Sequence, residues 1–127
     1  MTKTEAIIRS ILGPVRLDIR PLAQAVDLAI DILFVQKIAM DDIRVTKDIY
    51  PVVAKQLKKK PGAVSRKIER LANLCWDALS PDRKKEIIGE QRHDIRAPSE
   101  MIFYLAFYAH FGKPFFEVVS REPSLLF

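Results

Sequence analysis

The sequence contains few of the residues on which most enzyme and metal sites depend. It has one cysteine, two histidines and four glycines among 127 residues. A single cysteine excludes an internal disulfide, and no cysteine and histidine spacing suits a zinc site. No glycine-rich loop can bind a nucleotide phosphate, and neither His93 nor His110 lies beside a nucleophile motif. We therefore expect neither an enzyme nor a cofactor or metal site.

Long hydrophobic runs are also missing. The longest apolar segment covers residues 101–111, far short of the roughly 20 residues that a membrane-spanning helix needs. The N-terminal residues do not have the pattern of a secretory signal peptide. Together with the single cysteine, these absences predict a cytoplasmic protein with no membrane contact.

Helical periodicity is present along nearly the whole sequence. Hydrophobic residues make up 49% and charged residues 29%, which suits a single folded domain over residues 1–127. Apolar spacing, prolines and capping residues predict an all-α fold of about six helices. The expected helices cover residues 4–12, 20–36, 48–57, 61–79, 81–89 and 98–112, with a less regular connection over 37–44 and a polar loop over 90–97.

The excess of positive charge is concentrated in one segment. Residues 55–70 carry a charge of +6, whereas the rest of the chain carries −1. The basic residues of this segment are Lys55, Lys58, Lys59, Lys60, Arg66, Lys67 and Arg70. A local excess of this kind is typical of a surface that binds a polyanion.

The expected helix over residues 61–79 is amphipathic in a particular way. Apolar residues at helical spacing form one stripe that we expect to face the core: Val64, Ile68, Leu71, Cys75 and Leu79. The first ten residues are apolar only on this stripe, whereas apolar residues nearly surround the second half. We therefore expect the N-terminal half to protrude, so that residues 48–79 form a helix-turn-helix.

A protruding basic helix of this kind is suited to reading the major groove of duplex DNA. Arg66 and Arg70 are one turn apart and can each reach a guanine edge. Glu69 can accept a hydrogen bond from a cytosine amino group, and Ser65 can contact a base or a phosphate. The residues expected to contact phosphates are Lys55, Lys58, Lys59, Lys60, Lys67 and the amide of Gly62.

These residues also resemble a known family. The segment over residues 47–57, with its Tyr-Pro-x-x-Ala-Lys start, is followed by a Val64-x-Arg66-x-Ile68 spacing and by Trp76. The combination resembles the C-terminal effector domain of the sporulation initiation response regulator, the stage-zero regulator of endospore-forming bacteria. Weaker similarity extends over residues 8–30 and 98–102.

The resemblance implies a bacterial transcriptional regulator of sporulation with six helices, which binds tandem DNA sites as a homodimer through its last helices. Arg66 matches a family arginine that reads the site. Ala63 and Glu69 stand where the family has arginines, Ser65 where it has glutamate, and Arg70 where it has histidine. The resemblance thus implies DNA binding, but not the family's usual target sequence.

The 127 residues leave no room for the phospho-acceptor receiver domain of the full regulator. We therefore expect either constitutive activity or control by a regulatory protein partner. A second interpretation of the chain is a helical protein-interaction module that kept the fold, lost specific DNA reading and binds an acidic partner through the same basic face.

The last expected helix is apolar on nearly every side. Such a helix is either central to the core or has one edge in a subunit contact. If one edge of this helix lies in a subunit contact, the expected homodimer contacts are Tyr104, Tyr108, Phe111 and Phe115, helped by Phe116 and residues 125–127.

Overall fold

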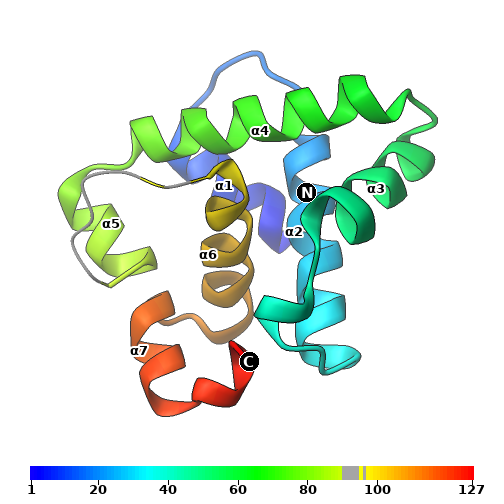
Figure 1. Cartoon of the computed structure of the whole chain (residues 1–127). Coiled ribbons are helices and arrows are strands. Elements are labelled where there is room, and N and C mark those ends of the chain that lie inside the picture. Colours follow the sequence, from blue (N-terminus) through cyan, green and yellow to red (C-terminus); the bar gives the residue numbers. More distant parts are fainter. Residues whose placement is uncertain (90–94, 96) are drawn as a thin grey trace.

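Helices make up almost all of the ordered secondary structure. The computed structural model describes residues 1–89, 95 and 97–127. Among these residues there is no strand, and the all-α prediction is confirmed (Figure 1). The α-helices are α1 (Lys3–Leu12), α2 (Arg20–Ile30), α3 (Tyr50–Leu57), α4 (Pro61–Ala78), α5 (Pro81–Ile87), α6 (Pro98–Phe111) and α7 (Phe115–Arg121).

Prolines and capping residues determine where these helices begin. Helices α2 to α6 each have a proline in the first turn, where the missing amide donor costs nothing. Helix α1 begins with a capping box, in which Thr2 and Glu5 each accept a hydrogen bond from the other's backbone amide. The Ser80 hydroxyl accepts the amide of Arg83 at the start of α5.

Two single turns of π-helix adjoin α2 and α3: the first lies within the expected helix over 20–36, and the second begins before the expected helix over 48–57. The turn Asp31–Val35 continues α2, and the turn Val45–Ile49 leads directly into α3. The start of the third helix, expected at residue 48, is therefore wrong by three residues, since helical structure begins at Val45. The Asp48 carboxylate accepts the amide of Arg44, just before this turn, at 2.9 Å.

Helix α6 forms the centre of the core. It packs against α1, α2, α4, α5 and α7, and in Figure 1 it lies across the direction of α4, with α7 and the C-terminus on the side away from α4. Phe107 is completely buried and meets Phe34 and Phe115 edge to face, at ring-centroid distances of 5.3 and 4.8 Å. The interpretation of this helix as a central core element is therefore confirmed.

A further helix, α7, was not expected from the sequence. It follows a short turn after α6 and buries Phe115, Val118 and Val119. The expected polar loop over residues 90–97, including His93, falls mostly on residues 90–94 and 96, which lie outside the described part of the chain.

Candidate nucleic-acid interface

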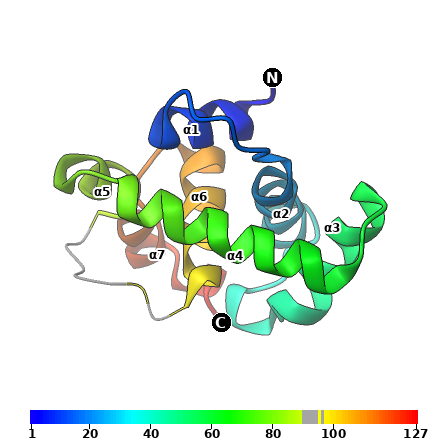
Figure 2. The same ribbon diagram turned by 90° about the horizontal axis from the view of Figure 1, so that it is seen from above.

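Helix α4 presents one continuous face to solvent. Its buried residues are Val64, Ile68, Leu71, Ala72, Cys75 and Trp76, and only the first two of these belong to its first ten residues. Arg66, Lys67 and Arg70 are exposed. Figure 2 shows α4 across the near face of the molecule, with α3 at one end and α5 at the other. The expected contrast between the two halves is present in part: the second half buries Leu71, Ala72, Cys75 and Trp76, but its residues Asn73, Asp77 and Ala78 are exposed.

The turn before α4 carries three exposed lysines. Lys58 ends α3 in the left-handed conformation, with φ 56° and ψ 47°, and the amide of Lys59 bonds back to the carbonyl of Ala54 at 3.0 Å. Lys60 is extended and precedes Pro61. Within the described residues no side chain caps the N-terminus of α4, which leaves the Gly62 amide at a positive helix end.

We call the seven exposed cations of this region the basic surface; they are Lys55, Lys58, Lys59, Lys60, Arg66, Lys67 and Arg70. None of them forms an ion pair with another residue that the structure describes. These seven cations come from α3, the turn and α4, which follow one another directly in the chain.

Two of the expected base-reading residues are held by the protein itself. Ser65 is half-buried, and its hydroxyl donates a hydrogen bond to the Gly62 carbonyl at 3.1 Å. Glu69 is half-buried and accepts a hydrogen bond from the Tyr50 hydroxyl of α3 at 3.3 Å. Burial and the neighbouring Glu69 carboxylate raise the pKa of Tyr50. Glu69 therefore helps to hold α3 against α4, which the helical wheel alone did not indicate.

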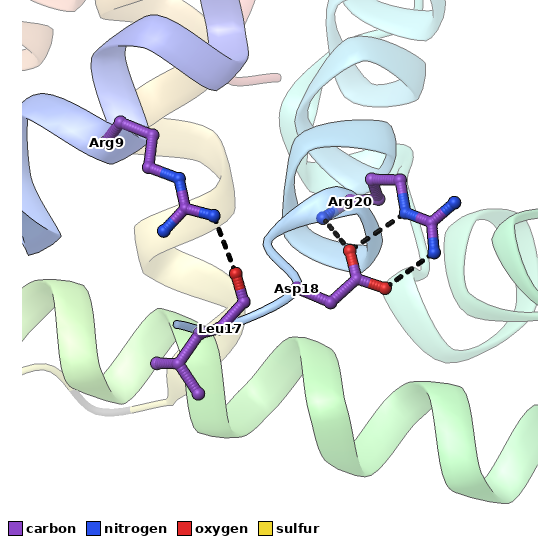
Figure 3. A network of polar contacts seen from close by, with 4 residues as sticks. All are labelled: Arg9, Leu17, Asp18 and Arg20. Atoms are coloured by element: carbon purple, nitrogen blue, oxygen red, sulfur yellow. Dashed lines mark hydrogen bonds and ion pairs between the residues drawn. The ribbon is translucent and has the colours of Figure 1, made fainter. Parts of the chain in front are cut away.

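The connection between α1 and α2 forms one flank of the basic surface. Arg9 donates to the carbonyls of Val15 and Leu17, each at 2.7 Å. Asp18 accepts three hydrogen bonds from Arg20: from its backbone amide, from Nε at 2.9 Å and from Nη2 at 2.8 Å (Figure 3). The Arg20 guanidinium lowers the pKa of Asp18 to about 2, and Lys59 contributes to the same shift.

A small cleft of about 150 Å³ joins this connection to α4. Its lining consists of Leu17, Asp18, Lys67, Arg70, Leu71 and Leu74. Asp18 and Arg20 were not among the residues expected at this interface. The sequence shows an acid and a base two residues apart before Pro21, which is compatible with a local ion pair. Nothing in the sequence places that pair beside α4.

The expected homodimer contacts need correction. Tyr104 and Phe115 are only 3% and 4% exposed, because α6 and α7 pack their aromatic rings together at 4.9 Å. A side chain buried within one chain has little surface left for a second copy. Tyr108 and Phe111 are half-buried, and the Tyr108 hydroxyl already donates to Glu86 at 2.7 Å.

A reactive thiol, a metal site and a membrane-spanning helix are three other features to consider among the described residues. Burial raises the pKa of the Cys75 thiol to about 12, so this cysteine stays protonated and unreactive. Across residues 1–89, 95 and 97–127, no group of acidic, histidine and cysteine side chains is arranged to hold a metal ion. Of the helices in the same residues, none has both the length and the apolar character to cross a membrane.

Comparison with models of protein families, with curated proteins and with solved structures found no match to this chain. The family resemblance therefore depends on the residues of the chain itself, above all those over 47–76.

Proposed function

We propose that this chain is a DNA-binding transcriptional regulator that places α4 in the major groove. The observation that carries the proposal is the basic surface, whose seven cations are exposed and form no ion pairs among the described residues. Helix α4 has 18 residues and is about 27 Å long, and the major groove is wide enough to admit one helix. The charge distribution and the exposed helix face therefore suit the same partner.

Within this proposal, Arg66 and Arg70 read base edges. Both are exposed and lie one turn apart near the middle of the free face of α4. Arginine reads guanine through two parallel hydrogen bonds. The Glu69 carboxylate already accepts from Tyr50, so we give it the role of orienting α3 and α4. Ser65 keeps a free lone pair and remains a candidate for a base or phosphate contact.

The remaining cations neutralise phosphates on either side of the groove. Lys55 and the three lysines of the turn lie at the α3 end, whereas Lys67 lies on the flank nearest the α1–α2 connection. The Gly62 amide adds a donor at the helix N-terminus. Binding as a homodimer to tandem sites, as the sporulation regulator resemblance implies, would have to use Tyr108 and Phe111 rather than the two buried aromatics.

The test compares a base-reading variant with a phosphate-contacting variant. Sequences bound by the wild-type protein are first selected from a random duplex pool, and affinities are then measured by fluorescence anisotropy. Arg66→Ala should cost about 1–3 kcal/mol on the selected sequence and much less on random duplex. Lys59→Ala should weaken every duplex by a similar factor and reduce the slope of log K against log salt by about 0.9.

Lys113→Ala is the matched control, because Lys113 is exposed in the turn between α6 and α7, away from α4. It should leave DNA affinity unchanged. Equal effects of Arg66→Ala on all sequences would exclude direct reading by Arg66. No binding of wild-type protein to any duplex at physiological salt would overturn the proposal and favour the interaction module with an acidic protein partner.

A further inference from the structure

A single carboxylate lies on the flank of the basic surface. Asp18 lines the same small cleft as Lys67 and Arg70 of α4, and it lies close enough to Lys59 for that ammonium to lower its pKa. Among the described residues that line this cleft, Asp18 is the one acid. The Glu69 carboxylate is hydrogen-bonded to Tyr50, and Glu5 of α1 lies near enough to Arg20 to raise the pKa of that guanidinium. Asp18 is therefore the negative charge that a phosphate on this flank would meet.

The position of Asp18 is fixed by its surroundings. Arg20 contacts the carboxylate through its backbone amide and two guanidinium nitrogens, and Arg9 holds the backbone just before it through the carbonyls of Val15 and Leu17. Figure 3 shows this network directly beside α4. Both partners are still well exposed, with 42% of the Asp18 and 60% of the Arg20 side-chain surface accessible. The carboxylate is thus hydrogen-bonded by Arg20 and still accessible from solvent.

We propose that the Asp18–Arg20 pair tunes the DNA affinity of the basic surface, with Asp18 weakening phosphate contacts on the α1–α2 flank of α4 and Arg20 partly offsetting that effect. The inference rests on the proposed function. A phosphate approaching Lys67 on this flank must come near the Asp18 carboxylate, which lines the same cleft, and like charges repel. Arg66 lies on the free face of α4 and does not line this cleft. Asp18 therefore lowers sequence-independent affinity, which limits loss of the protein to non-specific sites.

The test uses the two halves of the ion pair separately. Asp18→Asn removes the repelling charge, so its affinity for random duplex at about 0.1 M salt should rise about threefold to tenfold. Arg20→Gln leaves the carboxylate uncompensated, so affinity should fall. A merely structural role of the pair predicts instead that both variants weaken binding. Asp41→Asn is the control for net charge, because Asp41 is exposed and its backbone amide bonds to the carbonyl of Leu126, the residue before the C-terminal Phe127. This variant should bind as the wild type does.

Opposite shifts for Asp18→Asn and Arg20→Gln, which shrink together as salt is raised, would support the inference. If the wild-type protein binds duplex DNA but Asp18→Asn binds it equally well or more weakly, the inference is wrong. The proposed function would not be affected by that result. An equal gain in Asp41→Asn would also overturn it, since net charge alone would then explain the effect. If wild-type protein binds no duplex, the proposed function and this inference fail together.

Discussion

Helices α4 and α6 pack against each other, yet they use their side chains differently (Figures 1 and 2). Every residue from Met101 to Phe107 in α6 is buried, so the surface that this helix keeps lies at its ends, as at Tyr108 and Phe111. Helix α4 buries one stripe and leaves Arg66, Lys67 and Arg70 outside. Because of this difference in burial, substitutions in α6 should lower the free energy of unfolding. Substitutions on the exposed face of α4 should instead change the affinity for a ligand.

The largest effect should come from emptying the centre of the core. Phe107 is completely buried between Phe34 and Phe115, so Phe107→Ala should lower the free energy of unfolding by about 3–5 kcal/mol. Urea denaturation followed by circular dichroism measures this loss. Arg66→Ala is the α4 counterpart and should change stability by less than about 0.5 kcal/mol. Similar losses in the two variants would contradict the division between the helices.

A smaller loss of stability should follow from removing the hydrogen bond that joins α3 to α4. Tyr50→Phe removes the hydrogen bond to Glu69 and should cost about 0.5–1.5 kcal/mol of stability. Tyr108→Phe is the matched control, because it removes a bond to Glu86 at an exposed position, where water replaces the lost partner. We expect a clearly smaller loss for Tyr108→Phe in the same urea experiment. A larger loss of stability in Tyr108→Phe than in Tyr50→Phe would contradict the prediction that the Tyr50–Glu69 hydrogen bond stabilises the packing of α3 on α4.

The smallest effect should act on stability and binding in opposite directions. Lys58 has a left-handed backbone with φ 56°, which glycine adopts more readily than lysine. Lys58→Gly should therefore raise the free energy of unfolding by about 0.5–1 kcal/mol while weakening binding to all duplexes. The matched control is Lys59→Gly, because Lys59 has no positive φ; it should lose both stability and affinity. A loss of stability in Lys58→Gly would exclude backbone strain at this turn.

Much of the fold could be predicted because local signals determine it. Pro61 and the stripe from Val64 to Cys75 predicted α4 within one residue of its observed bounds, Pro61–Ala78. Pro98 and Gly112 did the same for α6. The π-helical turns Asp31–Val35 and Val45–Ile49 could not be predicted, since their hydrogen bonds span five residues and leave no distinct apolar period. Helix α7 has only seven residues, too few for periodicity to separate it from an exposed aromatic tail.

The candidate interface was only partly predictable for a related reason. The exposure of Arg66 and Arg70 follows from the position of the apolar stripe on one helix. The half-buried position of Glu69 depends on how α3 lies against α4, and the position of Asp18 beside α4 depends on the path of the α1–α2 connection. Both positions depend on contacts between segments that are far apart in the sequence. Composition and local spacing do not predict such contacts.

The packing of α4 also has a kinetic consequence. Because this helix contacts α1, α2, α3 and α6 at once, it cannot shift without disturbing four neighbours. Under the proposed function, DNA would therefore meet a helix that is already in place, and association would not wait for α4 to move. The speed of encounter should depend mainly on diffusion and long-range attraction, and any adjustment of shape would fall to the partner.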